Sequence, residues 1–181
     1  MVLLGCSPKG RLTEQHDVFF GIGESISGLV AEMNAFWPEA NGKLHIDAWR
    51  EITIVDGFAI EVISATTLNK NEQHLFFMNL GGYKPGEFEE YHYKMLCVAP
   101  KLATAVKNSK KTAFYKHCGF KGGESHIDEK YGIDIDDAHK VEDLLSAKLK
   151  LSYQIKITPS EHFMKEDELH IGYLKIKKLQ K

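Results

Sequence analysis

An internal repeat is the feature of this sequence that most constrains its fold. At a shift of 76 residues, five of the thirteen positions from residue 4 to residue 16 are identical, where random composition gives about one. The matched residues are Leu4, Gly5, Gly10, Glu14 and His16 in the first copy and Leu80, Gly81, Gly86, Glu90 and His92 in the second. Such a repeat predicts two copies of one structural unit.

A second matched block lies further along the chain, at a shift of 81 residues. The tripeptide His45-Ile46-Asp47 recurs as His126-Ile127-Asp128, and six of the twelve positions of this block are identical. The two shifts differ by five residues, an insertion that a surface loop can absorb. We therefore predict an internal duplication, with a first repeat unit at residues 1–79 and a second at residues 80–181, packed as one compact body.

The expected secondary structure repeats as well. The elements are predicted from apolar alternation, from helical spacing after a serine cap, and from turns that contain Gly or Pro. In the first unit we expect strands at 2–6 and 16–23, a helix from Ser25 or Ser27 to Phe36, a strand opened by His45, and a hairpin of 49–55 and 58–63 around Asp56-Gly57. In the second we expect strands at 75–80, 92–98, 149–157 and 169–176, a further strand opened by His126, a helix from Leu102 that closes near Gly119, and a helical turn at 141–147. The order is β, then βαβββ twice, which is an α+β fold with mostly antiparallel sheet and helices outside.

The composition is that of an ordinary globular protein, with 43% hydrophobic and 27% charged residues. The formal net charge of −2 gives no general attraction to nucleic acid or anionic lipid. The lysine-rich stretch 101–121 is predicted to be solvated surface, because aromatic side chains do not interleave with the lysines on its helix face. The apolar start, Met1–Gly5, lacks a basic leader, and no run reaches the roughly 20 apolar residues of a membrane span.

Three cysteines, Cys6, Cys97 and Cys118, are odd in number and widely spaced. This pattern indicates neither a disulfide framework nor a zinc knuckle. Each cysteine is predicted to be a small buried hydrophobe rather than a nucleophile. A reducing cytoplasm fits best.

Two recurring polar patterns, Glu-x-His and His-x-Asp, are the candidates for a functional site. Residues two apart on a strand share a face, so each pattern is predicted to form one polar patch. The ligand-binding candidates are Glu14, His16, Asp17, His45, Asp47 and Trp49 in the first copy and Glu90, His92, His126 and Asp128 in the second. The second copy is expected to bind less well, because Asp17 corresponds to Tyr93 and Trp49 to Lys130.

Three interpretations of these patches stay open at this point. If the two patches of a copy meet, their imidazoles and carboxylates suit a divalent metal with open positions, the candidate ligands being His16, His45 and Asp47. The same residues suit acid–base chemistry in which a carboxylate orients an imidazole. Alternatively, the side chains cap loops and strand ends and serve structure alone. No diagnostic spacing such as HExxH, an EF-hand loop or a Walker sequence is present, and a metal-free site is favoured over a metal site.

The motif residues also resemble a known family. Residues 14–21, Glu-Gln-His-Asp-Val-Phe-Phe-Gly, with residues 45–50, His-Ile-Asp-Ala-Trp-Arg, look like a bacterial family of uncharacterised proteins, domain-of-unknown-function 1543. Residues 80–83, Leu-Gly-Gly-Tyr, with residues 89–92, Glu-Glu-Tyr-His, look like a second copy of the same domain. The resemblance implies a domain that occurs in one or two copies and has no assigned activity.

A second similarity is architectural. Duplicated βαβββ modules are similar to those of the vicinal-oxygen-chelate enzymes, which place metal ligands on the first and last strands of each module. His16 and His92 lie on expected first strands, whereas the expected last strand of the first module, 75–80, carries no carboxylate. Similarity of fold assigns no function by itself.

The sequence thus predicts an uncharacterised cytoplasmic protein that binds a small polar ligand at its His/Asp/Glu clusters, whether or not it also catalyses a reaction. The alternative is a non-enzymatic interaction or scaffold protein whose repeats are purely structural and which forms a homo-oligomer. Membrane and nucleic-acid partners are not expected. Whether the two patches of one copy meet in space decides between these classes.

Overall fold

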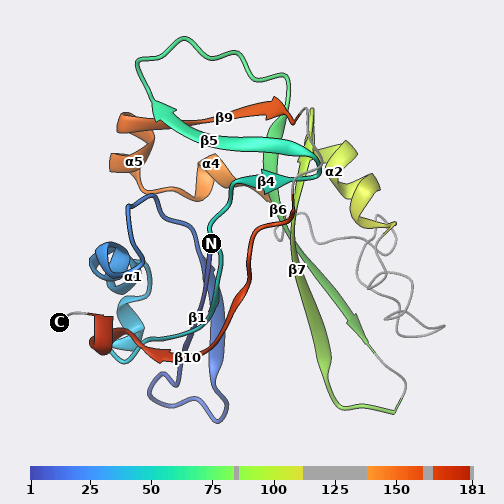
Figure 1. The fold of residues 1–181 in the computed structure, drawn as a ribbon. Coiled ribbons are helices and arrows are strands. Elements are labelled where there is room, and N and C mark those ends of the chain that lie inside the picture. Colours follow the sequence, from blue (N-terminus) through green and yellow to red (C-terminus); the bar gives the residue numbers. More distant parts are fainter. Residues whose placement is uncertain (84–85, 112–137, 161–164, 180–181) are drawn as a thin grey trace. The chain divides into compact units, whose positions relative to one another are not determined.

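The structure is a computed structural model that describes residues 1–83, 86–111, 138–160 and 165–179 (Figure 1). The chain forms two compact units. Unit 1 consists of Met1–Ile54, Leu145–Leu151 and Lys165–Lys181, and unit 2 of Val55–Leu144 and Ser152–Met164. Each unit is built from separated segments, and the repeat boundary between residues 79 and 80 stays a prediction.

Unit 1 contains a four-stranded sheet in the order β10-β3-β1-β2. Strand β1 pairs antiparallel with β2 and with β3, and β3 pairs antiparallel with β10. The elements are β1 (Val2–Cys6), β2 (Gln15–Phe19), η1 (Ser27–Leu29), α1 (Val30–Phe36), η2 (Pro38–Ala40), β3 (His45–Trp49), α5 (Ala147–Ser152), β10 (His170–Lys175) and η4 (Ile176–Leu179). Strand β4 (Ile54–Val55) spans the boundary with unit 2, and the last residue of α5 lies beyond it.

The hydrophobic core of unit 1 lies on one face of this sheet. Leu4 of β1 and Met33 of α1 are both fully buried in it, so α1 covers that face. The buried members of the core are Val2, Leu4, Cys6, Phe19, Val30, Met33, Ala40, Leu44, Ile46 and Ile176. Successive residues of a strand point to opposite faces, so Gly5 lies on the face away from the helix.

A β-bulge in β3 changes which of its side chains face the core. Between Leu3 and Leu4 of β1 the register of pairing with β3 shifts, which leaves Asp47 as the extra residue. As a result Ile46 and Trp49, three residues apart, both pack with the core. The predicted polar patch on this strand therefore loses its tryptophan.

Unit 2 contains two three-stranded sheets, in the orders β7-β6-β8 and β4-β5-β9. The pairings β6 with β7, β6 with β8 and β5 with β9 are antiparallel. The elements are β5 (Phe58–Ser64), β6 (His74–Tyr83), β7 (Glu90–Ala99), α2 (Leu102–Ser109), β8 (Ala138–Lys140), α4 (Val141–Leu144) and β9 (Tyr153–Pro159). Ala105 of α2 is buried with Met78 and Leu80 of β6, so this helix packs on the first of the two sheets.

The α+β class is confirmed, and so are most of the predicted strands. The turn between β4 and β5 also has the predicted geometry. Asp56 and Gly57 both adopt positive φ, 52° and 79°, as a two-residue hairpin turn of this type requires. The Asp56 carboxylate accepts a hydrogen bond from the backbone N–H of Val98 at 2.8 Å, which ties the turn to β7.

Four predicted boundaries are wrong. Residues 147–152 are helical, so the strand expected from residue 149 begins at Tyr153. The hairpin arm expected at 49–55 is confined to Ile54–Val55. Strand β2 ends at Phe19 rather than at residue 23, and α2 ends at Ser109. The strand expected to open at His126 lies outside the described residues. Among the described residues, β8 is the later strand that pairs with β6.

The two units share one local arrangement. In unit 1 the hairpin β1–β2 pairs Gly5 with His16, and in unit 2 the hairpin β6–β7 pairs Gly81 with His92. A helix follows each hairpin, and a later strand then pairs with the first strand of the hairpin. The glycine–histidine pairing therefore occurs in the same register in both units.

Candidate functional site

Gly5 forms the floor of the candidate site. It lies between His16 on β2 and His45 on β3, on the face of the sheet away from α1. A Cβ atom at this position would lie 2.3 Å from His45 Nε2 and 2.7 Å from Asp47 Oδ2. Only a glycine leaves room here for the His45 imidazole and the Asp47 carboxylate to lie over the strand.

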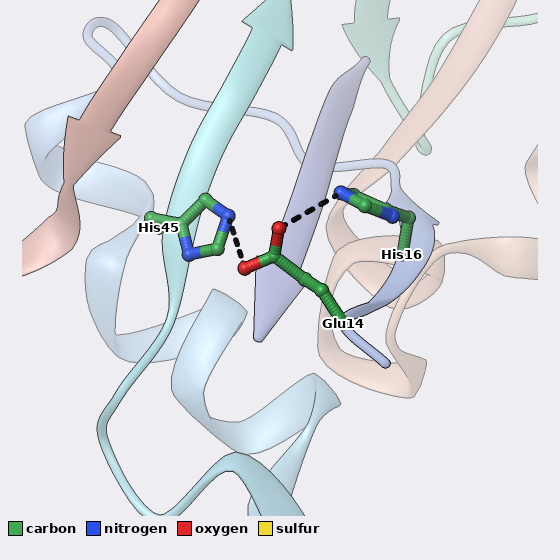
Figure 2. Close-up of side chains that lie close together, drawn as sticks. All are labelled: Glu14, His16 and His45. Atoms are coloured by element: carbon green, nitrogen blue, oxygen red, sulfur yellow. Dashed lines mark ion pairs between the residues drawn. The ribbon is translucent and has the colours of Figure 1, made fainter. Parts of the chain in front are cut away.

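The two predicted polar patches meet above this glycine. The Glu14 carboxylate lies between the two imidazole rings, 3.3 Å from His45 Nε2 and 3.8 Å from His16 Nε2 (Figure 2). Asp47 Oδ2 lies 3.3 Å from the Nε2 atom of each histidine. We call Glu14, His16, His45 and Asp47 the Gly5 cluster.

Two atoms of the Gly5 cluster are buried without a hydrogen bond. The His45 side chain is 4% exposed. Its Nε2 and Asp47 Oδ2 have no hydrogen-bond partner among the described residues, although they lie at ion-pair distance from each other. An unsatisfied buried polar atom typically costs about 1–3 kcal/mol. The described residues therefore leave the hydrogen-bonding capacity of these two atoms unused.

Strand β10 contributes aromatic side chains that no sequence pattern indicated. The Tyr173 ring lies 4.4 Å from the His45 ring, centroid to centroid. At the other end of the β10–β3 pairing His170 stacks on Trp49, with centroids 3.9 Å apart and planes at 10°. Gly172 between these two residues has φ +148°, where the pairing of β10 with β3 is irregular. No local motif marked these residues, because they join the sheet from the far end of the chain.

Two first-copy candidates lie apart from the Gly5 cluster. Asp17 pairs with the core residue Leu4, which places it on the opposite face from His16. Its Oδ1 accepts a hydrogen bond from the backbone N–H of Val18 at 2.7 Å. Trp49 stacks on His170 and packs against the core of unit 1. Four of the six first-copy candidates are thus brought together.

Unit 2 repeats part of the arrangement. His92 Nε2 lies 4.0 Å from Glu90 Oε1, and a Cβ atom at Gly81 would lie 3.0 Å from the same oxygen. The other two second-copy candidates, His126 and Asp128, lie outside the described residues. Within the described residues, unit 2 therefore brings one histidine and one carboxylate over its glycine, where unit 1 brings two of each.

The chemistry of the Gly5 cluster is that of an electron-pair donor. With its carboxylates ionised and its imidazoles neutral, it carries two negative charges and two ring-nitrogen lone pairs within a few ångströms of each other. Such a set attracts a cation or a group rich in hydrogen-bond donors. A carboxylate beside an imidazole also suits proton transfer.

The two described cysteines, Cys6 and Cys97, pack in hydrophobic cores rather than in the Gly5 cluster. Cys6 and Cys97 are free and buried, as predicted, while Cys118 lies outside the described residues. Burial raises the pKa of the Cys6 thiol. Burial, with a smaller effect of the Asp56 carboxylate, raises the pKa of the Cys97 thiol to about 12.

We therefore expect Cys97 to resist alkylation in the folded protein. The thiolate is the reactive form, and a raised pKa keeps it scarce until the pH approaches the folded value. Native protein treated with iodoacetamide at pH 8 should show no labelled Cys97 by peptide mass spectrometry, whereas protein in urea should be labelled. The folded thiol keeps its proton above the usual pKa of 9.0, whereas the unfolded thiol loses it. The free energy of unfolding should therefore fall as the pH rises from about 9 toward 12. Rapid native labelling would contradict this.

Comparison with known proteins gives a partial match and a fold. Residues 11–62 match the model of a family described as Domain of Unknown Function (DUF1543), a stretch that contains the whole Gly5 cluster. A crystal structure of the protein Il1583 from Idiomarina loihiensis is similar, with a TM-score of 0.62 and 19% sequence identity over 97% of this chain and 94% of that chain. At this identity the likeness shows the fold alone. No curated protein matches the chain. Among the described residues, no helix combines the length and the apolar character needed to cross a membrane.

Proposed function

We propose that this protein binds a small polar ligand at the Gly5 cluster. The observation that carries the proposal is the pair of buried atoms without hydrogen bonds, His45 Nε2 and Asp47 Oδ2, on a site that only a glycine floor makes room for. If the four side chains served structure alone, a buried imidazole nitrogen would be expected to have a hydrogen-bond partner. A bound ligand would supply that partner.

The ligand is expected to carry positive charge or several hydrogen-bond donors. Both carboxylates are acceptors, and the neutral imidazoles offer ring-nitrogen lone pairs. An amine, a guanidinium group, a polyol or a metal ion fits this demand, whereas an anion would be repelled by Glu14 and Asp47. Proton transfer between a carboxylate and an imidazole would make the same site catalytic, which we include in the proposal without assigning a reaction.

We further propose that unit 2 carries the second copy of a duplicated bacterial domain, in which Glu90 and His92 correspond to Glu14 and His16. The equal register of Gly5 with His16 and of Gly81 with His92 supports this. The free, buried thiols of Cys6 and Cys97 support a reducing compartment such as the cytoplasm.

A metal-free screen tests the ligand proposal. With EDTA present throughout, ethylenediamine, guanidinium, glycerol and sorbitol are added while the imidazole resonances are followed by NMR. At least one probe should shift the ring signals of His16 and His45. The His16→Ala variant should lose the response and the matched His92→Ala variant should keep it. An equal loss of the response in both variants, or no shift with any probe, would contradict the proposal.

A second candidate function, interaction or self-association, is favoured by strand β10. It is the edge of the unit 1 sheet, and Leu169, Ile171 and Tyr173 on or beside it are exposed. An apolar edge strand is a surface on which another chain can pair. Sedimentation over a range of concentrations tests this candidate, and a monomer throughout would leave self-association without support.

A further inference from the structure

We infer that the Gly5 cluster is a binding site for a divalent transition metal of the zinc type. The ligands are His16 Nε2, His45 Nε2 and a Glu14 carboxylate oxygen, with Asp47 Oδ2 beside them. The inference rests on the proposed function, since it names the cation that the site binds.

The distances between donor atoms agree with a common metal. Ligand atoms at about 2.0–2.2 Å from a tetrahedral ion lie about 3.3–3.6 Å from one another. The separations of His45 Nε2 from Glu14 Oε1 and from Asp47 Oδ2 are both 3.3 Å. His16 Nε2 is 3.3 Å from Asp47 Oδ2 and 3.8 Å from Glu14 Oε2. The donor atoms of Glu14, His16 and His45 all lie within 4.8 Å of one another, so small rotations of exposed side chains complete the set.

The buried histidine supplies an independent reason. His45 is more than nine-tenths buried and its Nε2 has no hydrogen-bond partner among the described residues, yet this atom points at the carboxylates of Glu14 and Asp47. The Tyr173 ring against the imidazole and the glycine floor beneath it hold the ring in this orientation. A metal ion bound to His45 Nε2 would satisfy that atom, and a molecule bound at the metal could donate a hydrogen bond to Asp47 Oδ2. An ion pair alone leaves them unsatisfied.

The donor set selects the class of metal. Magnesium and calcium prefer oxygen ligands throughout, whereas two imidazole nitrogens with carboxylates suit zinc, iron, cobalt or nickel. With two histidines and one carboxylate as protein ligands, a four-coordinate ion keeps one open position. A hydroxyl or amine of a small molecule can occupy that position. Glu14 and His16 are exposed, so the metal is accessible from solvent.

Calorimetric titration with Zn²⁺ tests the inference directly. The full chain is prepared without an affinity tag, stripped with EDTA and dialysed before titration. We expect one strong Zn²⁺ site per chain and a rise in melting temperature on loading. The exposed variants His16→Ala and Glu14→Gln should each weaken binding at least about 100-fold. The matched variant His92→Ala, altered at the corresponding position of unit 2, should bind like the unaltered chain.

The outcomes separate this inference from the proposal on which it rests. Absence of a strong Zn²⁺ site, or equal affinity in His16→Ala and the unaltered chain, overturns the metal inference. A probe response in the EDTA-containing screen then still supports ligand binding at the Gly5 cluster. The metal inference is supported if Zn²⁺ binds strongly, His16→Ala weakens this binding and His92→Ala leaves it unchanged. This holds even if no probe gives a response in the metal-free screen. His45→Gln serves as a fourth variant, with circular dichroism to confirm that it folds.

Discussion

Replacing Gly5 with alanine is expected to abolish Zn²⁺ binding and to destabilise unit 1. The new Cβ atom would lie 2.3 Å from His45 Nε2 and 2.7 Å from Asp47 Oδ2, far inside contact distance. The His45 ring cannot move aside without cost, because it is buried and faces the Tyr173 ring. Overpacking of this kind costs about 1–3 kcal/mol. Displacing the His45 ligand and the Asp47 carboxylate beside it should lower Zn²⁺ affinity at least about 100-fold.

Gly81→Ala is the matched control for that variant. Gly81 holds the same place in the β6–β7 hairpin that Gly5 holds in the β1–β2 hairpin. A Cβ atom added at Gly81 would lie 3.0 Å from the Glu90 carboxylate, which is the half-exposed end of a flexible side chain. We therefore expect little change in stability and none in Zn²⁺ affinity. Urea unfolding and calorimetric titration measure both quantities. Equal effects of the two variants, or an unchanged Zn²⁺ affinity in Gly5→Ala, would show that the glycine floor does not shape the site.

The meeting of Glu14, His16 and His45 follows only in part from short-range rules. Period-two spacing predicts Glu14 and His16 on one face, and in the structure Glu14 directly precedes β2, on which His16 lies. The hairpin β1–β2 and the return of β3 beside β1 then bring the patterns to one face. The sequence left open whether the two patterns meet, because β1 and β3 are not consecutive strands and their pairing depends on how the whole unit folds.

The position of Trp49 was not predictable from spacing. Its separation from His45 and Asp47 by even numbers of residues places it on their face of a regular strand. The bulge at Asp47 reverses the alternation beyond that point, so the indole packs against the core instead. A bulge has no unique sequence signature, and the register shift depends on strands that pair from elsewhere in the chain.

The error at residues 149–152 has a different cause. Leu149 and Leu151 alternate with lysines, a pattern that predicts the start of a strand. In the structure Leu149 is buried and Leu151 is exposed, on a short helix. The Ser146 hydroxyl accepts a hydrogen bond from the backbone N–H of Leu149 at 3.3 Å, as a capping serine does. The serine was the missed signal, because a two-residue alternation is compatible with a single helical turn.

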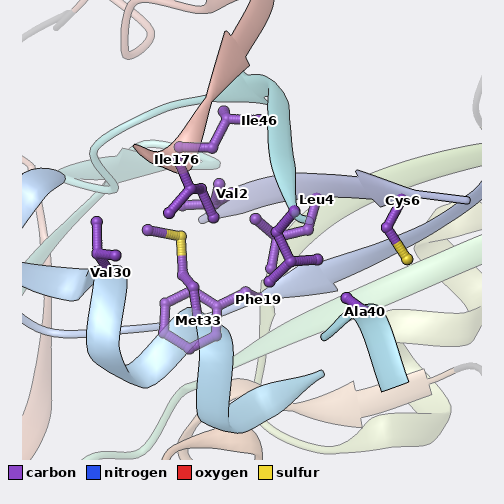
Figure 3. Packing of buried hydrophobic residues seen from close by; sticks show 10 residues of the cluster. Val2, Leu4, Cys6, Phe19, Val30, Met33, Ala40, Ile46 and Ile176 are labelled. Carbon is purple, nitrogen blue, oxygen red and sulfur yellow. The ribbon is translucent and has the colours of Figure 1, made fainter. Parts of the chain in front are cut away.

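Replacing Leu4 with alanine is expected to have the largest effect on folding. Leu4 is 0% exposed and belongs to the buried core of unit 1 together with Met33 and Phe19 (Figure 3). Removing a fully buried leucine side chain costs about 2–5 kcal/mol, a large fraction of the roughly 5–15 kcal/mol by which domains are stable. Urea unfolding should give this loss in the free energy of unfolding, and hydrogen exchange should show reduced protection in β1, β2 and β3.

Leu80→Ala is the matched variant in unit 2, where Leu80 is 1% exposed. This variant should reduce the protection from exchange in β6 and β7 instead. A cost below about 1 kcal/mol for Leu4→Ala would mean that the sheet of unit 1 does not close on the helix as described, because the cost of the cavity depends on how tightly Leu4 is packed.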